Sequence, residues 1–112
     1  MLEKLQFYID GRWVDPVEPR TLDVVNPATE SVYGRISLGS SADVDKAVAA
    51  ANRAFESFSR TTREERTELL QAILAEFMKR HDDVAEAIMD EMGAPWALAK
   101  GAQALSGPQH IK

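Results

Sequence analysis

The spacing of apolar residues changes at Ser40, and this change limits the chain to few architectures. Before Ser40 the sequence alternates between apolar and polar residues and contains frequent turn signals, which is typical of short β-strands. From Ser40 onward apolar residues recur every three to four positions, which is typical of amphipathic helices. The sequence therefore predicts a beginning made of strands and a longer helical part.

The first expected hairpin pairs Gln6–Asp10 with Arg12–Val14. The dipeptide Asp10-Gly11 favours this turn because a tight primed turn needs residues that accept positive φ. A loop is expected over Asp15–Arg20, since its two prolines remove backbone donors that a strand would use.

A second hairpin is expected between Thr21–Val25 and Val32–Ser37, with its turn at Asn26-Pro27. The following stretch, Gly34–Ser41, has the glycine spacing of a phosphate-binding loop. The match fails because Ser40 stands where that loop needs a lysine. A strand, a turn and a helix cap explain the stretch better.

Four helices are expected after the hairpins. Ser40 with Asp43 and Thr62 with Glu65 form capping boxes for the first two, and Gly93 favours a left-handed end to the third. We expect the apolar stripes to be buried faces. The stripe of the first helix consists of Val44, Ala47, Val48, Ala51, Phe55 and Phe58, and that of the second, which ends near Arg80, consists of Leu69, Leu70, Ile73, Leu74, Phe77 and Met78. The third helix is expected over Asp82–Met92. The fourth is expected from Pro95 to about Ser106, where Gly107-Pro108 ends it.

Composition allows at most one domain with a modest core, because the chain has 112 residues, of which 45% are hydrophobic. A net charge of -5 and dispersed basic residues argue against a nucleic-acid partner. No apolar run reaches the roughly 20 residues that span a membrane. We therefore expect a soluble, cytoplasmic protein.

The absence of cysteine excludes disulfides and thiolate metal sites.

Isolated polar residues give no catalytic site. His81 and His110 belong to no metal-binding spacing, and His81 is expected at a helix end. Acids concentrated in one helix are more often a solvated face than a catalytic carboxylate pair. These acids are Asp82, Asp83, Glu86, Asp90 and Glu91.

Several segments, in their order and spacing, resemble the amino-terminal part of NAD(P)-dependent aldehyde dehydrogenases. Ala94 stands where the family more commonly has lysine, in an element similar to Glu-x-Gly-Lys-Pro. The segments are Phe7–Val14, Val25–Glu30, Asp43–Val48, Arg66–Leu74 and Glu91–Pro95.

The resemblance implies an α/β family with a Rossmann-like fold, of which this segment supplies two antiparallel hairpins and three to four amphipathic helices. It implies that residues 1–112 are the amino-terminal part of a cofactor-binding domain, with the catalytic and oligomerisation parts absent. The family oxidises aldehydes to carboxylic acids through a cysteine thiolate, with NAD or NADP as cofactor. No catalytic or cofactor-binding residue matches this segment, so we expect the chain alone to be inactive and to bind no cofactor.

The resemblance also implies a structural monovalent cation in some family members. Its ligands would be backbone oxygens just before the Asn-Pro turn and an acid before the glycine element, which correspond here to Val24, Val25 and Glu91. Oxygen ligands of this kind suit hard cations. The alternative is that Glu91 faces solvent or caps a helix.

Two functions remain open. The chain is either an amino-terminal portion of an aldehyde dehydrogenase, with the remainder of that enzyme as its partner, or a noncatalytic helix-rich association module. In the second case apolar helix faces drive self-association or binding to another chain.

Overall fold

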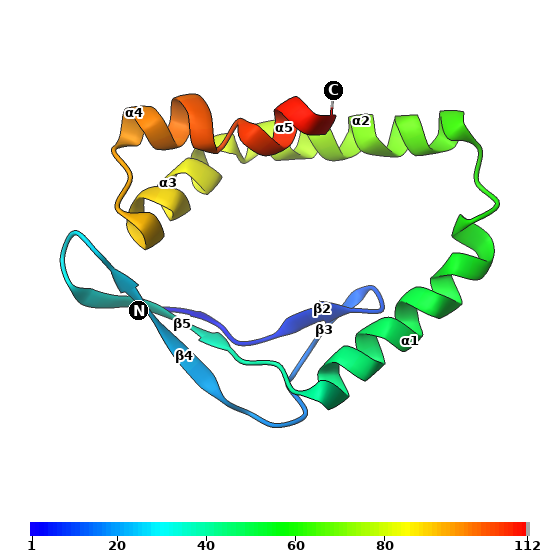
Figure 1. Cartoon of the computed structure of the whole chain (residues 1–112), viewed down its shortest axis with the longest axis horizontal. Coiled ribbons are helices and arrows are strands. Elements are labelled where there is room, and N and C mark those ends of the chain that lie inside the picture. Colours follow the sequence, from blue (N-terminus) through cyan, green and yellow to red (C-terminus); the bar gives the residue numbers. More distant parts are fainter. Residues whose placement is uncertain (112) are drawn as a thin grey trace. The chain divides into compact units, whose positions relative to one another are not determined.

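The computed structural model describes residues 1–111, which divide into two units (Figure 1). The first unit contains Met1–Val25 and Val32–Arg60, and the second contains Asn26–Ser31 and 61–111. The turn of one hairpin therefore belongs to the second unit, whereas most of its two strands belong to the first. None of the helices in the described range is long and apolar enough to cross a lipid bilayer.

The first expected hairpin is confirmed. Strands β2 (Phe7–Ile9) and β3 (Arg12–Val14) pair in antiparallel orientation. Asp10 and Gly11 form the turn with φ values of 56° and 75°, because this type of turn needs positive φ at both positions. The expected loop over Asp15–Arg20 is also confirmed, since it contains no strand.

The second expected hairpin is confirmed as β4 (Thr21–Asn26) and β5 (Ser31–Ser37). A strand that the sequence did not predict, β1 (Leu2–Lys4), pairs in parallel with β5. Gly34 permits this close approach, because a Cβ there would lie 2.9 Å from the carbonyl oxygen of Leu2. Three residues are too few to show a period, so β1 depends on its partner strand for its conformation.

An ion-pair network lies on one face of this sheet. Arg35 Nε lies 2.9 Å from Asp23 Oδ1, and Arg35 Nη1 lies 3.9 Å from Glu3 Oε1. The hydrogen bond to Asp23 and the charge of Asp23 raise the pKa of the Arg35 guanidinium above its ordinary value. Alternate residues of a strand point to the opposite face. The large apolar side chains exposed on that face are Leu2, Leu22, Val32 and Ile36, and the exposed Lys4 lies on the same face.

Helix α1 (Ser41–Phe58) begins with the expected capping box, centred on the Asp43 carboxylate. This carboxylate accepts hydrogen bonds from the backbone N–H of Ser40 at 2.9 Å and of Val17 at 3.0 Å. Asp43 is only 5% exposed, and it ties the loop after the first hairpin to the helix. The hydrogen bonds from Ser40 and Val17 lower the pKa of the Asp43 carboxyl below its ordinary value of 3.8.

We expect Asp43 to make the stability of the fold depend on pH in the acidic range. Because its folded-state pKa is lowered, ionised Asp43 contributes stability in full above the ordinary pKa. That contribution is lost as the pH falls through the folded-state value. Asp43→Asn should therefore lower the urea midpoint more at about pH 7 than at about pH 2, because acid reduces the contribution of the ionised carboxylate in the parent chain.

Circular dichroism during urea titration at these two pH values measures the effect. The matched control is Asp45→Asn, which removes a charge from the exposed side of the same helix. An equal loss for Asp43→Asn at both pH values would show that the ionised carboxylate is not the stabilising form.

The expected burial of the helical stripes is wrong in this chain. In α1 only Asp43 and Ala50 are buried, and no residue of the second helix is buried. The spacing of apolar residues predicted the helices correctly. An apolar stripe shows only that a helix has an apolar side, and it does not show that another element covers this side. The large side chains left about half exposed or more are Val44, Val48, Phe55, Phe58, Leu69, Leu70, Ile73 and Met78.

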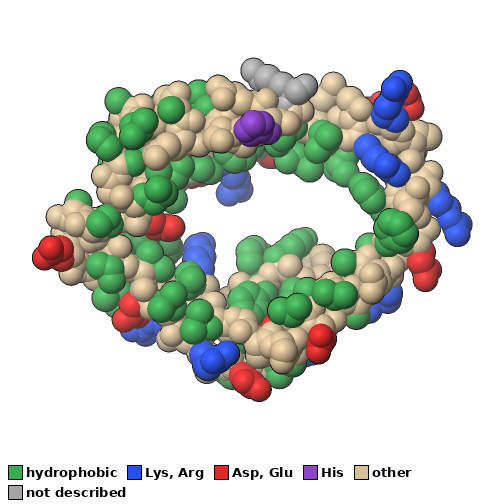
Figure 2. Space-filling view, viewed as in Figure 1, with side chains coloured by type: hydrophobic (Ala, Val, Ile, Leu, Met, Phe, Trp, Pro, Cys, Tyr) green, Lys and Arg blue, Asp and Glu red, His purple; other side chains and the backbone are tan. Residues whose placement is uncertain are grey.

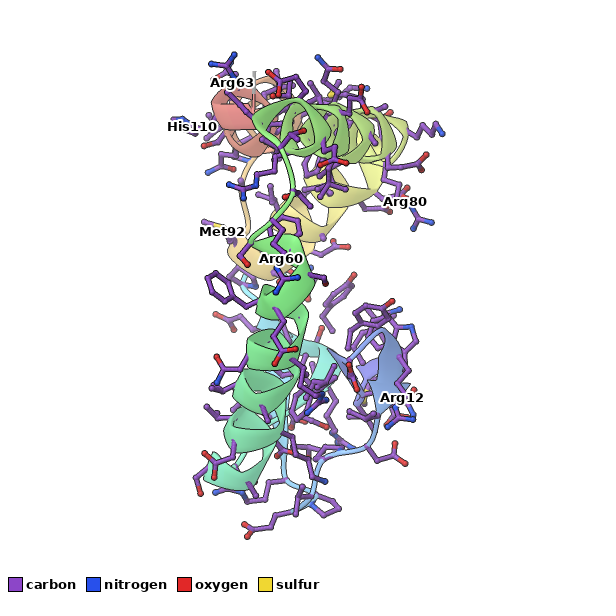
Figure 3. The ribbon with its side chains drawn as sticks, turned by 90° about the vertical axis from the view of Figure 1, so that its right-hand side faces the viewer. Arg12, Arg60, Arg63, Arg80, Met92 and His110 are labelled. Carbon is purple, nitrogen blue, oxygen red and sulfur yellow. The ribbon has the colours of Figure 1, made fainter. Side chains whose placement is uncertain are left out.

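The second unit consists mainly of helices. α2 (Arg63–Lys79) starts at the second expected capping box, and α3 (His81–Met92) ends at Gly93, whose φ is 71°. Arg80 separates these two helices and is labelled in Figure 3. α5 (Ser106–Ile111) packs along α2 (Figure 1). The second and third expected helices are therefore confirmed.

The expected single helix from Pro95 to Ser106 is wrong. A short α4 (Trp96–Leu98) continues into a π-helical turn, η1 (Ala99–Gln103), and α5 follows after two further residues. Gly107-Pro108, which we expected to end a helix, instead lies in the first turn of α5. Proline is tolerated there because a first-turn residue has no helical acceptor for its missing N–H.

The π-helical turn allows the core of the second unit to close. The N–H of Ala104 donates to the carbonyl oxygen of Ala99 at 2.8 Å, five residues earlier. This wider turn brings Ala99 and Ala104 to one face, where both pack with Ala85 of α3. No bulky side chain is fully buried within the described residues, so this core consists of close contacts between alanines.

Candidate functional site

The predicted cation ligands lie on two elements. Val24 and Val25 belong to β4 in the first unit, and Glu91 is the second-last residue of α3 in the second unit. The side chain of Val24 is half-buried, whereas Val25 and Glu91 are exposed. Because these residues belong to different units, the cation site stays a prediction.

The turn after β4 and the end of α3 meet within the second unit. Asn26 Oδ1 accepts hydrogen bonds from the backbone N–H groups two and three residues later, at 2.9 and 3.4 Å, which closes an Asx turn. Gly93 lies so close to this turn that a Cβ would be 2.9 Å from Pro27 Cγ. Glycine is therefore needed both for the left-handed end of α3 and for this contact.

The expected ligands of the cation are one carboxylate and backbone carbonyl oxygens. Among residues 1–111, histidine, aspartate and glutamate side chains form no group of three or more that could hold a metal ion. The sequence also lacks cysteine. One carboxylate with backbone carbonyl oxygens is a modest ligand set, which fits a structural role.

A polar cluster that sequence reasoning missed lies at the start of α3. Asp82 Oδ1 is 2.8 Å from Lys100 Nζ, and this ammonium group lies 5.5 Å from the centroid of the Trp96 ring. The hydrogen bond from Lys100 lowers the pKa of the Asp82 carboxyl. The pair links α3 to η1. No sequence signal could reveal it, because its members are 18 residues apart.

His81 lies beside this cluster. We expected it where the second helix ends, but it is the first residue of α3, directly after Arg80. Its Nδ1 is 3.5 Å from Asp82 Oδ1. Its Nε2 is buried and accepts or donates no hydrogen bond within the described part of the chain. Asp82 thus lies between His81 and Lys100, and its contact with Lys100 is the shorter of the two.

A charged cleft of about 280 Å³ lies between the first hairpin and α1. Arg53 Nη2 and Asp10 Oδ2 form an ion pair of 3.1 Å at its edge. Three cationic and three carboxylate side chains line it, so it has no clear preference for a charged ligand. They are Arg12, Lys46, Arg53, Asp10, Asp15 and Asp43.

The glycine-containing stretch Gly34–Ser41 contains the expected strand and helix cap, joined by an irregular connection where we expected a turn. β5 extends to Ser37, and Ser40 is the N-cap of α1. The Cβ position of Gly39 would lie 3.7 Å from the ring of Phe7, so this connection packs on the first hairpin.

Comparison with known proteins identifies the family. The model of the aldehyde dehydrogenase family matches residues 13–112, which is most of the chain. The chain belongs to the aldehyde dehydrogenase family. The resemblance inferred from the ordered segments is thereby confirmed.

Curated relatives of this aldehyde dehydrogenase segment are much longer. The 3-succinoylsemialdehyde-pyridine dehydrogenase of a Pseudomonas species is 48% identical over 112 residues, which cover 99% of this chain and 24% of the relative. The chain thus spans about a quarter of the length of the curated relatives it matches.

Solved aldehyde dehydrogenases confirm the fold of the segment. The enzyme from Bartonella henselae matches with a TM-score of 0.96 and 45% identity, over 99% of this chain and 23% of that one. Aldehyde dehydrogenase C of Pseudomonas syringae, solved with NAD⁺ and octanal, matches with a TM-score of 0.92 and 42% identity, over 95% and 22%. The segment therefore has the α/β fold of the amino-terminal part of the family.

Proposed function

We propose that this chain forms the first part of the cofactor-binding domain of an aldehyde dehydrogenase that oxidises aldehydes to carboxylic acids with NAD or NADP. The match of residues 13–112 to the family supports the proposal. The NAD⁺ and octanal in the structure of the Pseudomonas syringae relative favour this chemistry for the intact protein.

Within that enzyme the chain serves as a scaffold. The family reaction needs a cysteine thiolate that attacks the aldehyde carbon and later releases the acid from a thioester. These 112 residues contain no cysteine, and they contain no Gly-x-Gly-x-x-Gly dinucleotide fingerprint. We assign none of them to catalysis or to the nicotinamide cofactor. We expect the chain alone to be inactive.

A chimera tests the proposal. In this chimera the chain replaces the matched first quarter of the Pseudomonas 3-succinoylsemialdehyde-pyridine dehydrogenase, with which it is 48% identical. We expect the chimera to reduce NAD in the presence of the relative's aldehyde, and the isolated chain to give no rate above a buffer blank. Turnover by the isolated chain, or a folded chimera without activity, would contradict the proposal.

A noncatalytic association module is the second candidate, and the exposed apolar side chains of α1 and α2 favour it. Such a module forms oligomers whose size depends on concentration. Size-exclusion chromatography over a wide concentration range distinguishes the two candidates when combined with the activity of the chimera. A compact monomer at all concentrations would count against self-association.

We also propose that the backbone carbonyl oxygens of Val24 and Val25, together with the Glu91 carboxylate, hold a monovalent cation. The proposal is supported by the meeting of the Asn-Pro turn and the end of α3 within one unit. In the chimera, sodium or potassium chloride should raise the thermal midpoint above that in choline chloride at equal ionic strength.

Glu91→Gln should remove this difference between salts, because it removes the only charged ligand. Glu86→Gln is the matched control, since it removes a charge from an exposed position of the same helix and should preserve the difference. Equal thermal midpoints in all three salts would disprove the cation site.

A further inference from the structure

The turn of the first hairpin joins a carboxylate directly to a glycine. Asp10 and Gly11 are its two central residues, and Arg12, which follows them, is labelled in Figure 3. The outermost pair of the ladder is Ile9 with Arg12, so the N–H of Gly11 lies outside the ladder. Both turn residues are exposed, and nothing lies within 4 Å of the position that a Cβ on Gly11 would take. The Gly11 nitrogen is therefore unhindered next to the Asp10 carboxyl group.

Asp10 holds an uncommon backbone conformation for a residue with a side chain. Its φ of 56° lies in the left-handed region, which is costly for most residues other than glycine. Aspartate is tolerated there because its short polar side chain can form local hydrogen bonds. Rearrangement of the peptide between Asp10 and Gly11 therefore relieves a disfavoured φ, and it removes no hydrogen bond of the ladder.

No other aspartate within residues 1–111 has this combination of features. Asp10 is the only aspartate that glycine follows, and Asp15 precedes a proline, whose nitrogen carries no proton. Asp23 lies within β4. The remaining aspartates lie in helices, where the helical geometry fixes the next backbone nitrogen. They are Asp43 and Asp45 in α1, and Asp82, Asp83 and Asp90 in α3.

We propose that Asp10 is a modification site, at which aspartate isomerises spontaneously to isoaspartate through a succinimide ring. The Gly11 nitrogen loses its proton and bonds to Asp10 Cγ, while one Cγ–O bond breaks and a water molecule leaves. A second water molecule then adds to the backbone carbonyl carbon of Asp10 and breaks its bond to the Gly11 nitrogen. The chain now runs through Cβ and Cγ, and one oxygen comes from solvent. The composition is unchanged, and water is the only co-reactant.

The modification changes the length of the turn. Isoaspartate adds one atom to the backbone, whereas the register of β2 and β3 fits a turn of two ordinary residues. The pairing brings Tyr8 and Trp13 together on one side of the hairpin, with a distance of 5.2 Å between their ring centroids. Isomerisation therefore loosens the hairpin. The inference does not depend on the proposed function of the chain.

Arg53 of α1 opposes the ring closure. Its Nη2 lies 3.1 Å from Asp10 Oδ2, and both side chains are more than half exposed. The succinimide has no carboxylate, so ring closure removes this ion pair. Because exposed ion pairs contribute little, loss of the pair should speed up the reaction only about two- to fivefold. Figure 2 shows charged side chains of both signs at the surface along α1, so the same helix offers a control.

Heavy-oxygen water measures the reaction, because each passage through the ring incorporates one oxygen from solvent. The full chain is incubated in this water at mildly acidic pH, transferred to ordinary water and digested with trypsin. Cleavage after Lys4 and Arg12 releases residues 5–12, in which Asp10 is the only acidic side chain. We expect heavy oxygen to accumulate faster in this peptide than in any other. Electron-transfer fragmentation should place isoaspartate at residue 10.

Three variants separate the contributions. Arg53→Gln should label about two- to fivefold faster than the parent chain. Lys46→Gln removes the same charge from an exposed position of the same helix and should label at the parent rate. Gly11→Ala should label more slowly, because its Cβ shields the nitrogen. Circular dichroism establishes that each variant is folded.

Two results would overturn the inference. Residues 5–12 without heavy oxygen, or another peptide that labels at an equal or higher rate, would exclude Asp10 as the preferred site. Equal rates for Arg53→Gln and Lys46→Gln would show that the ion pair does not restrain the reaction.

Discussion

Replacing Gly93 by alanine is expected to lower the free energy of unfolding of the second unit by about 2 to 3 kcal/mol. Two costs combine at this position. A φ of 71° lies in the left-handed region, which costs an alanine about 1 to 2 kcal/mol. The new Cβ would also lie 2.9 Å from Pro27 Cγ, so the turn before β5 must move. Urea unfolding followed by circular dichroism measures the loss.

Two other glycines separate these costs. Gly11 has a φ of 75°, but nothing lies within 4 Å of the position that its Cβ would take, so Gly11→Ala has only the conformational cost. Gly101 lies in η1 with open space around it, and Gly101→Ala should be neutral or stabilise by up to about 1 kcal/mol. If Gly93→Ala costs no more than Gly11→Ala, the contact with Pro27 contributes nothing.

Replacing Ala85 by leucine should destabilise the second unit by about 3 kcal/mol. Ala85 is fully buried, and it packs against Ala99 and Ala104, which are 0% and 2% exposed. The added carbon atoms have no space unless α3 and η1 separate. That separation also weakens the ion pair between Asp82 and Lys100, which joins the same two elements.

The urea midpoint of Ala85→Leu, compared with that of Ala102→Leu, measures this overpacking. Ala102 is exposed on η1, so leucine there should change stability by no more than about 0.5 kcal/mol. Hydrogen exchange should show faster opening of α3 and η1 in Ala85→Leu alone. Similar midpoints for the two variants would mean that the alanine core is looser than these contacts indicate.

Elements that depend on neighbouring residues were predictable from the sequence. The Asp10-Gly11 turn, the Ser40 and Thr62 caps and the left-handed Gly93 each depend on conformational preferences or hydrogen bonds within a few residues. The hairpins and the first three helices follow from these local signals. Family membership was also predictable, because several such segments occur in a characteristic order.

Elements that depend on distant residues were not predictable. β1 is a strand because β5 offers it a partner more than 30 residues later. The π-helical turn exists because Ala99 and Ala104 must reach the same face as Ala85. The link between Asp82 and Lys100 likewise needs α3 and η1 to meet. No short window of the sequence contains any of these three conditions.

The candidate site shows the same division. The resemblance supplied Val24, Val25 and Glu91 as cation ligands, and it indicated that no catalytic residue lies in the segment. The contact of Gly93 with Pro27, which joins the adjoining turn to the end of α3, became visible only in the structure. The geometry of the ligands themselves remains a prediction.

By itself the sequence determined the two hairpins and the first three helices, where most of these elements begin and end, and to which family the chain belongs. Turns, caps and apolar spacing depend on residues that are close together in the chain, so they can be predicted from the sequence. The tertiary structure decided which apolar residues are covered. Ala50 of α1 and Ala85 of α3 are buried, whereas Val44, Val48 and Phe55 remain exposed, because burial depends on which surfaces meet.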